Sequence, residues 1–428
     1  MMLRRFPVVP AGVIAAATLM AGTQPAAAAA AFRVSVPCST TALASALAGA
    51  VGGETIRLAT GCDYVLTAAL PPISTKLTIQ GQGATLERST AARTPGFAIL
   101  TVNTAGLSVS NLTIRNGDGG IDFDETSNQN QTNNITVTRS TFTGNAGGGI
   151  NLGGRDSSFG LATGTITGST FTDNGGGIND YGDSLTVTGS SFTGNTGGGL
   201  TTEEGEIAHH EVGAIAVTGS TFSGNSGGGI TCRGGEACKV TVTCSVFSHN
   251  TGSGISAYNA DGASISATHS VFRGNKSSYG GAIDMSAFVS GELTAADDTF
   301  TDNTATAGGG GIFNLESAAL TGDIFTGNSA TMGGAMENEW HAAVTDTTFA
   351  GNKASEDGGA IYQTNPFGSG TLSITGGRIT GNSASGDGGG IYNAGPPAGR
   401  ASVSQSTTVS NNKPDNCAPL GSVLGCTG

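Results

Sequence analysis

The sequence predicts an all-β protein, a right-handed parallel β-helix of about 12 coils with a short N-terminal capping helix and a disulfide-pinned C-terminal tail. Three observations predict it: a repeated Phe-x-x-Asn unit, Val/Ile/Thr-rich segments of alternating polarity before the repeats, and 72 glycines among 428 residues. Charged residues make up only 11% of the chain and hydrophobic residues 37%. This composition excludes a disordered polar chain, and the lack of a three-residue glycine period excludes collagen.

The first 31 residues are typical of a cleaved signal peptide. Arg4 and Arg5 precede an apolar segment from Val8 to Met20, and a run of alanines ends at Ala31. The apolar segment is shorter than the roughly 20 residues that span a bilayer. We therefore expect a secreted, extracellular protein with no membrane span after signal removal. A net charge of -13 disfavours nucleic acid as a partner.

We divide the rest of the chain into an N-terminal cap with the first coils at 32–110, the β-helix repeats at 111–412 and a C-terminal cap at 413–428. Both ends of a solenoid expose unpaired strand edges that need covering. At the first end, Leu43 and Leu47 follow a Ser/Thr start at i, i+4 spacing, which predicts a short helix over the first coil. At the other end, prolines and cysteines are expected to stop strand pairing.

The repeat pairs Phe-x-x-Asn with a following Gly-Gly-(Gly/Ala)-Ile and recurs at steps of 21 to 30 residues. Such a unit is too short for a helix of three turns and predicts two or three short strands joined by turns. We expect the Asn to adopt left-handed backbone and the glycines to supply positive φ. Stacked units would place each apolar side chain above its counterpart. The first half of the unit occurs at Phe142/Asn145, Phe171/Asn174, Phe192/Asn195, Phe222/Asn225, Phe247/Asn250, Phe272/Asn275, Phe300/Asn303, Phe325/Asn328, Phe349/Asn352, Ile379/Asn382 and Val409/Asn412.

Seven cysteines in an exported chain favour disulfides over metal thiolates. Two pairs lie at the chain ends, and we expect them to form staples. In the central trio, the Cys-x5-Cys-x5-Cys spacing matches no common zinc pattern. We favour a central disulfide with Cys244 free over a metal site completed by His249. The expected pairs are Cys38–Cys62, Cys417–Cys426 and Cys232–Cys238.

The combination of Gly-Gly-Ala-Ile, at Gly280–Ile283 and Gly358–Ile361, with Phe-x-x-Asn resembles the repeat of chlamydial polymorphic outer-membrane proteins. It is also similar to secreted right-handed β-helix proteins of actinobacteria, within the pectin-lyase-like superfamily. The resemblance covers about residues 110 to 412, and a similar N-terminal cap covers about 34 to 90. It implies a β-helix fold. For function it implies a wide range, because the superfamily includes polysaccharide lyases, hydrolases, epimerases, adhesins and structural rods.

If the Ile of each Gly-Gly-x-Ile strand points inward, the residues one and three later point outward. The densest group of such residues is Glu337 and Glu339, about 6.7 Å apart, with Asp284 two coils away, near 9.6 Å. Both separations suit the acid and base of an inverting glycosidase. The candidate catalytic residues are therefore these three carboxylates. The alternative is a solvated acidic face. Candidate sugar-binding residues are Trp340, His341, Tyr362 and Tyr392.

A second polar cluster lies in a long interval between repeats. Its carboxylates and imidazoles suit a divalent cation such as Ca²⁺ or Zn²⁺. No ligand spacing is diagnostic, so a polar surface loop is the favoured alternative and no cofactor is expected. The weak metal-ligand candidates are Glu203, Glu206, His209 and His210.

The sequence lacks the Gly-His-Gly and Asn-Thr-Asp motifs expected in polygalacturonases, and the basic cluster of a pectate-lyase site. The favoured function is therefore a non-enzymatic, adhesin-like β-helix that presents an acidic and amide-rich face to a polysaccharide or cell-surface glycan. The alternative is a carbohydrate-active enzyme, a hydrolase or lyase that uses the carboxylates near Glu337.

Overall fold

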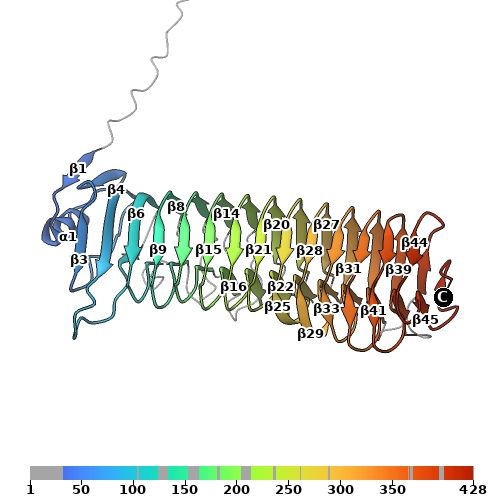
Figure 1. Cartoon of the computed structure of the whole chain (residues 1–428). Helices are drawn as coiled ribbons and strands as arrows, with labels where there is room; N and C mark the ends of the chain where they lie inside the picture. Colours follow the sequence, from blue (N-terminus) through green and yellow to red (C-terminus); the bar gives the residue numbers. More distant parts are fainter. Residues whose placement is uncertain are drawn as a thin grey trace, which may run out of the picture. The chain divides into compact units, whose positions relative to one another are not determined.

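The computed structural model describes residues 32–103, 106–123, 134–152, 163–180, 184–203, 214–234, 238–260, 262–287, 290–364, 366, 370–394 and 400–427. The predicted signal peptide lies outside them. Within 32–427, successive coils of short parallel strands stack in chain order, as Figure 1 shows. The prediction of an all-β parallel solenoid of about 12 coils is confirmed.

Sheet A contains the two strands that come first in each coil. Its strands pair in parallel with the equivalent strand of the next coil. In the described residues it comprises 28 strands: β1 (Arg33–Val36), β2 (Glu54–Leu58), β3 (Asp63–Leu66), β4 (Leu77–Arg88), β6 (Leu107–Arg115), β8 (Asn134–Thr138), β9 (Thr141–Thr143), β11 (Thr163–Thr167), β12 (Thr170–Thr172), β14 (Ser184–Thr188), β15 (Ser191–Thr193), β17 (Ala214–Thr218), β18 (Thr221–Ser223), β20 (Lys239–Thr243), β21 (Val246–Ser248), β23 (Ser264–Thr268), β24 (Val271–Arg273), β27 (Glu292–Ala296), β28 (Thr299–Thr301), β31 (Ser317–Thr321), β32 (Ile324–Thr326), β35 (His341–Thr345), β36 (Thr348–Ala350), β39 (Thr371–Thr375), β40 (Arg378–Thr380), β43 (Arg400–Val403), β44 (Thr408–Ser410) and β46 (Val423–Leu424).

Sheet B contains the strand that follows the glycines of each repeat. Among the described residues its 13 strands are β5 (Leu100–Val102), β7 (Ile121–Phe123), β10 (Ile150–Asn151), β13 (Ile178–Asp180), β16 (Leu200–Glu203), β19 (Ile230–Arg233), β22 (Ile255–Tyr258), β26 (Ile283–Ser286), β30 (Ile312–Asn314), β34 (Met336–Asn338), β38 (Ile361–Gln363), β42 (Ile391–Asn393) and β45 (Cys417–Ala418). Sheet C begins only part-way along the chain and consists of β25 (Lys276–Tyr279), β29 (Thr304–Gly308), β33 (Ser329–Ala330), β37 (Lys353–Ala354) and β41 (Ser383–Ala384).

The repeated phenylalanines form a continuous stack in the core, as the repeat predicts. From Phe142 to Phe349, neighbouring ring centroids lie 4.4 to 5.0 Å apart and the planes differ by 2 to 11°. In most coils the residue before the Ile is glycine, and the ring stack lies close to it: a Cβ on Gly149 would lie 2.7 Å from the ring of Phe171. Ala282, Ala335 and Ala360 take this position in three later coils. Close packing, in addition to positive φ, therefore explains part of the glycine excess.

The repeated asparagines form a buried ladder, which corrects the expectation that they adopt left-handed backbone. Each side-chain Nδ2 donates to Oδ1 of the next Asn at 2.8 to 3.1 Å. The residue before the Asn takes positive φ instead, as at Gly144 and His249. The physical reason is that an amide both donates and accepts, so it can bond to both neighbouring coils. The ladder residues are Asn145, Asn174, Asn195, Asn225, Asn250, Asn275, Asn303, Asn328, Asn352, Asn382 and Asn412.

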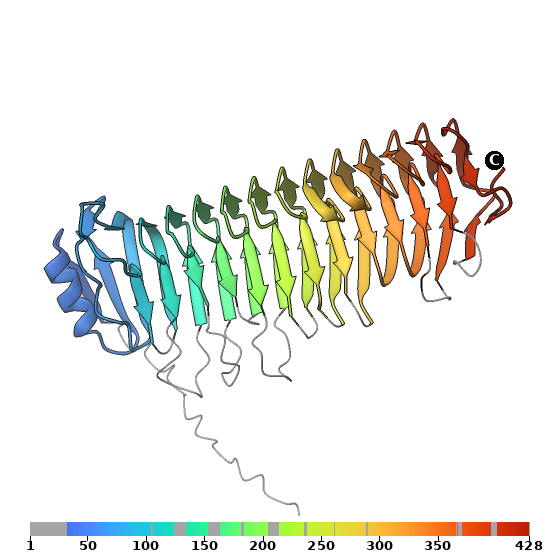
Figure 2. The ribbon, with the colours of Figure 1, turned by 90° about the horizontal axis from the view of Figure 1, so that it is seen from below.

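The predicted capping helix is α1 (Thr40–Ala48), which buries Leu43 and Leu47. Figure 2 shows it at the end of the first coils. The side chain of Ser39 caps its N-terminus by accepting a hydrogen bond from the backbone N–H of Ala42. A disulfide, Cys38–Cys62, ties the start of this helix to the strand region that follows.

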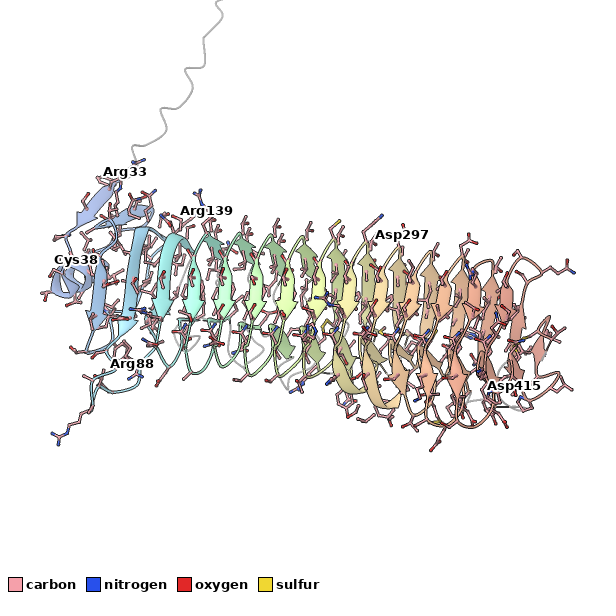
Figure 3. The ribbon with its side chains drawn as sticks, in the orientation of Figure 1. Arg33, Cys38, Arg88, Arg139, Asp297 and Asp415 are labelled. Carbon is pink, nitrogen blue, oxygen red and sulfur yellow. A yellow bond between two sulfur atoms is a disulfide. The ribbon has the colours of Figure 1, made fainter. Side chains whose placement is uncertain are left out.

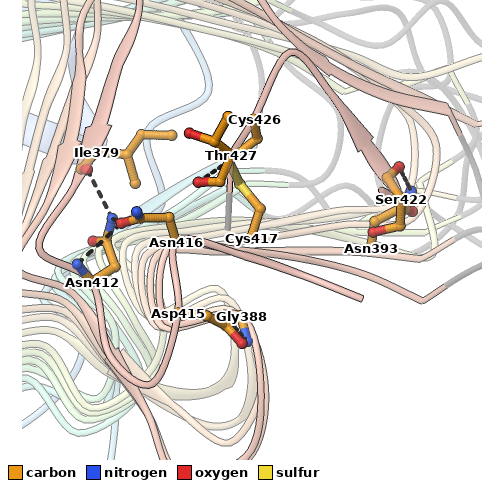
Figure 4. The surroundings of a disulfide bond; sticks show 10 residues. All are labelled: Ile379, Gly388, Asn393, Asn412, Asp415, Asn416, Cys417, Ser422, Cys426 and Thr427. Carbon is orange, nitrogen blue, oxygen red and sulfur yellow. Dashed lines mark hydrogen bonds between the residues drawn. A yellow bond between two sulfur atoms is a disulfide. The ribbon is translucent and has the colours of Figure 1, made fainter. Parts of the chain in front are cut away.

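The last coil is tied down by the disulfide Cys417–Cys426 (Figure 4). Beside it, Asn412 ends the asparagine ladder: its Nδ2 donates to Asn416 Oδ1 at 3.1 Å and to the carbonyl of Ile379 at 3.0 Å. The structure also contains Cys232–Cys238 and a free, exposed Cys244. Three disulfides fit an oxidising compartment, extracellular or periplasmic.

No helix in the described part of the chain is long and apolar enough to cross a membrane.

Candidate functional site

One column of side chains runs along the outer face of sheet B, as the repeat predicts. Strand register places the residue after each inward Ile directly beside its counterpart in the next coil. We call this the sheet B column. In chain order it contains Asp122, Asn151, Asn179, Thr201, Thr231, Ser256, Asp284, Phe313, Glu337, Tyr362 and Tyr392.

Glu337 is buried, not part of a solvated acidic face. Its side chain is 3% exposed, and no described residue donates a hydrogen bond to its Oε2. The carboxyl fits because Gly308, in sheet C, has no side chain: a Cβ there would lie 1.4 Å from Oε2. Burial, followed by the nearby charge of Glu339, raises the pKa of Glu337 to about 8. It is therefore a neutral carboxylic acid at pH 7.

The three candidate carboxylates occupy different local positions. Strand β34 ends at Asn338, so Glu339 lies in the bend after the strand, where its charge still contributes to the raised pKa of Glu337. Asp284 is two coils from Glu337, as expected, but Phe313 occupies the intervening coil. An aromatic side chain therefore separates Asp284 from Glu337.

The candidate sugar-binding residues fall into two places. Tyr362 and Tyr392 stack on each other in the sheet B column, with ring centroids 5.4 Å apart. Burial and the neighbouring Glu337 carboxylate raise the pKa of Tyr362 to about 12. Trp340 and His341 lie where the chain passes from sheet B to sheet A. Their rings make an edge contact at 4.9 Å, and His341 Nδ1 bonds to Thr371 Oγ1 at 2.9 Å.

The candidate metal ligands are largely outside the described residues. Glu203 ends strand β16, and Glu206, His209 and His210 belong to the segment that the structure does not describe. Among the described residues no group of three or more His, Cys, Asp or Glu side chains is arranged to hold a metal ion.

A pocket of about 390 Å³ lies over strands β19, β22 and β26, at the place where sheet C begins. Tyr258 and Tyr279 line it, and these residues are 52% and 44% exposed. Arg233 and Asp284 contribute charged groups of opposite sign. The pocket therefore combines aromatic surface, hydroxyl groups, a carboxylate and a guanidinium.

Asp284 is held in this pocket by two serines. The hydroxyls of Ser286 and Ser256 hydrogen-bond to its two carboxylate oxygens, the latter at 3.4 Å. Burial raises the pKa of Asp284 to about 6, and these hydrogen bonds oppose the shift. The carboxylate is therefore ionised at neutral pH and accepts hydrogen bonds.

Strand β25 creates the pocket. It is the first strand of sheet C and forms only isolated bridges to the preceding coil, at Thr251 and Gly252. Its last residue, Tyr279, covers Phe313, with ring centroids 4.6 Å apart. This contact explains why Phe313 is 5% exposed although it belongs to the outward column.

Sequence reasoning missed this pocket, although a signal was present. From Asn145 to Asn250, the repeat Ile follows the ladder Asn by four or five residues. From Asn275 to Asn382 the interval is eight or nine residues. The extra residues form sheet C. The jump in spacing at Asn275 therefore marks the start of sheet C, next to which Tyr279, Tyr258 and Arg233 line the pocket.

Two family models match the chain. The model of the right handed beta helix region matches residues 128–290, and the Chlamydia polymorphic membrane protein repeat matches residues 299–315, 346–364 and 377–394. The chain is a right-handed β-helix with repeats like those of the Chlamydia polymorphic membrane protein. In this β-helix the repeat matches include the three coils whose glycines precede Ile312, Ile361 and Ile391.

Solved structures similar to this β-helix include tailspike protein 3 of bacteriophage CBA120, with 14% identity over 89% of this chain and 59% of that chain, at a TM-score of 0.40. An alginate lyase of the PL6 family has 12% identity, coverage of 92% and 53%, and a TM-score of 0.46. A thermostable α-1,3-glucanase from Streptomyces thermodiastaticus has 16% identity, coverage of 91% and 71%, and a TM-score of 0.42. The chain thus spans little more than half the length of the tailspike protein and of the alginate lyase. At such identities these similarities concern the fold alone. No curated protein sequence matches the chain.

Proposed function

We propose that this protein is an extracellular carbohydrate-binding β-helix, which holds a glycan on the outer face of sheet B at the pocket around Asp284. The observation that carries the proposal is the pairing of two exposed tyrosine rings with a carboxylate and a guanidinium in one pocket. Tyrosine rings pack on the apolar faces of sugar rings, while Asp284 and Arg233 accept and donate hydrogen bonds to hydroxyls.

The proposal favours binding without catalysis. Glu337 has the protonation state of a general acid at pH 7, which favours the alternative of a polysaccharide hydrolase. Its burial argues against that role, because a general acid must come within hydrogen-bond reach of the leaving oxygen. Phe313 also separates Glu337 from Asp284, the nearest carboxylate along the sheet B column.

A glycan array followed by calorimetric titration of the best ligand tests the proposal. We expect Tyr258→Ala to weaken binding about fivefold, because it removes an aromatic sugar platform worth on the order of 1 kcal/mol. Binding should also weaken as the pH falls through about 6, where Asp284 becomes protonated. Ile324→Ala is the matched control, since Ile324 is 46% exposed but lies in strand β32 of sheet A.

A reducing-sugar assay on the bound glycan distinguishes the two functions. Binding without sugar release is the expected result. Release that is lost in Glu337→Gln would establish the hydrolase instead. Unchanged affinity in Tyr258→Ala would show that the glycan binds elsewhere.

A further inference from the structure

The carboxylate of Asp284 has only neutral partners among the described residues. They are the hydroxyls of Ser256 and Ser286 and the backbone N–H of Ser286. An ionised carboxylate accepts about four hydrogen bonds, so a position remains for a ligand. Because a charge that is partly removed from water is normally paired, the pocket is complementary to a group that is positively charged and donates hydrogen bonds.

Two tyrosines lie beside this carboxylate. Asp284 is in register with Ser256 of the preceding coil, and Tyr258 lies two residues further along that strand on the same face. Such outward side chains form rows along the stacked coils (Figure 3), about 4.8 Å apart between coils and about 6.7 Å apart along a strand. Tyr258 is therefore a diagonal neighbour of Asp284, within reach of a long side chain. In the following coil Asp284 is in register with Phe313, which the ring of Tyr279 covers.

A carboxylate between two aromatic rings favours an ammonium group over a hydroxyl group as the ligand. An ammonium group donates up to three hydrogen bonds and carries the charge opposite to that of Asp284. It is also attracted to the face of an aromatic ring within about 6 Å, which a neutral hydroxyl is not. The net charge of the chain, -13, attracts cationic glycans and repels acidic ones.

The guanidinium of Arg233 belongs to a different part of the pocket. Strand register aligns Arg233 with Tyr258, and Tyr258 with Ser286. The side chain of Arg233 therefore begins two coils, or about 9.6 Å, before the coil of Asp284. A polymer that runs along sheet B can place an ammonium group at Asp284 and the hydroxyls of a neighbouring sugar at Arg233.

We propose that the glycan bound at this pocket is an amino sugar polymer, whose ammonium group pairs with Asp284 between Tyr258 and Tyr279. This inference rests on the proposed function and names the class of sugar. The ammonium group donates to the remaining acceptor position of the carboxylate, and the sugar ring lies against a tyrosine ring. The selectivity of the pocket is then for a free amine over an acetylated amine or a hydroxyl at the same carbon.

Calorimetric titration of the full chain with three tetramers tests the proposal. The tetramers share one β-1,4-linked backbone and consist of glucosamine, N-acetylglucosamine or glucose. At about pH 6.5 and low salt, where Asp284 is ionised, we expect the glucosamine tetramer to bind about tenfold more tightly than the other two. The preference should shrink in about 0.5 M NaCl, because salt screens the charge pair. This comparison of ligands needs no variant that could fail to fold.

Asp284→Asn should reduce the tenfold preference to less than about twofold, because it removes the charge and keeps the shape of the side chain. The matched control is Asp173→Asn. Asp173 is exposed, lies in the turn after strand β12 outside the pocket, and has a φ of +54°, which Asn also tolerates. The control removes the same charge from the chain and should keep the full preference.

Equal affinities for the three tetramers, all weakened by Tyr258→Ala, would overturn the amino sugar and leave the proposed function intact. A preference that survives in Asp284→Asn would also overturn it, because the ammonium group would then bind elsewhere on the acidic surface. So would butylamine that bound as tightly as the glucosamine tetramer, since the pocket would then accept an amine without a sugar. If no tetramer and no glycan on the array binds, the proposed function fails together with this inference.

Discussion

Replacing Glu337 by Gln should remove a large part of the pH dependence of stability. The folded state raises the pKa of Glu337 from 4.5 to about 8. A carboxyl with a raised pKa contributes stability that is complete below pH 4.5 and is lost as the pH rises through 8. Between these values the folded state binds one more proton than the unfolded state. The free energy of unfolding then falls by about 1.4 kcal/mol per pH unit.

From pH 5 to pH 7, this single group should lower the unfolding free energy by on the order of 2 to 3 kcal/mol. Urea unfolding at pH 5, 6 and 7 measures it. Other buried carboxyls with raised pKa values, Asp298 and Asp323 at about 7, contribute to the total slope. The difference between the Glu337→Gln variant and the unaltered protein isolates Glu337, since these groups are common to both.

A matched control is Glu356→Gln, which removes an exposed carboxylate. The pH profile of this variant shows how much of the effect on stability comes from losing one negative charge alone. The reasoning would be refuted by parallel pH profiles for the unaltered protein and Glu337→Gln. A constant offset between them would mean that Glu337 is ionised in the folded state and that the space beside Gly308 contains a partner for its carboxylate.

Two further substitutions test the packing. Gly308→Ala should destabilise the fold by about 3 kcal/mol, because the new Cβ would lie 1.4 Å from Glu337 Oε2. Thermal unfolding measures the loss. Adding Glu337→Ala to the Gly308→Ala chain should restore at least half of it. Asn250→Ala should cost about 3 to 5 kcal/mol in urea unfolding, because it removes one of the two acceptors of the Asn225 side-chain amide and the side-chain donor to the carbonyl of Phe222.

Controls for these two variants come from open and exposed positions. Gly52→Ala adds a Cβ where no atom lies within 4 Å, and Asn134→Ala removes an exposed amide. Both should change stability by less than about 1 kcal/mol. If the losses of unfolding free energy caused by Gly308→Ala and Glu337→Ala simply add in the double variant, the proposed contact between the two residues is contradicted. A loss below 1 kcal/mol in Asn250→Ala would contradict the cooperative ladder.

Much of the fold is predictable from the sequence because each coil repeats the same local pattern. Phe142 predicts Phe171 one coil later, and the rings stack as expected. The role of the ladder Asn was not predicted correctly, because both a turn and a side-chain ladder favour asparagine. A single chain segment does not show which of these two roles the residue has. Only the stacking of coils shows that the amide bonds to its neighbours.

The candidate site was predictable only in part. The alternation of strand side chains correctly places Glu337 and Asp284 in one column, two coils apart. It does not reveal that Glu337 is buried, because the space it occupies is made by Gly308 in another sheet. Nor does it show that Tyr279 covers Phe313, the residue that lies between the two carboxyls in this column.

The sequence by itself determined the repeat, its stacking order and the side chains that line the sheet B column, because these depend on periods of two residues and of one coil. The tertiary structure decided which of those side chains meet water. Burial depends on two residues of sheet C, Gly308 and Tyr279, whose contacts with sheet B the alternation along a single strand does not show. For this reason the pocket at Asp284 is complete only when the coils are stacked.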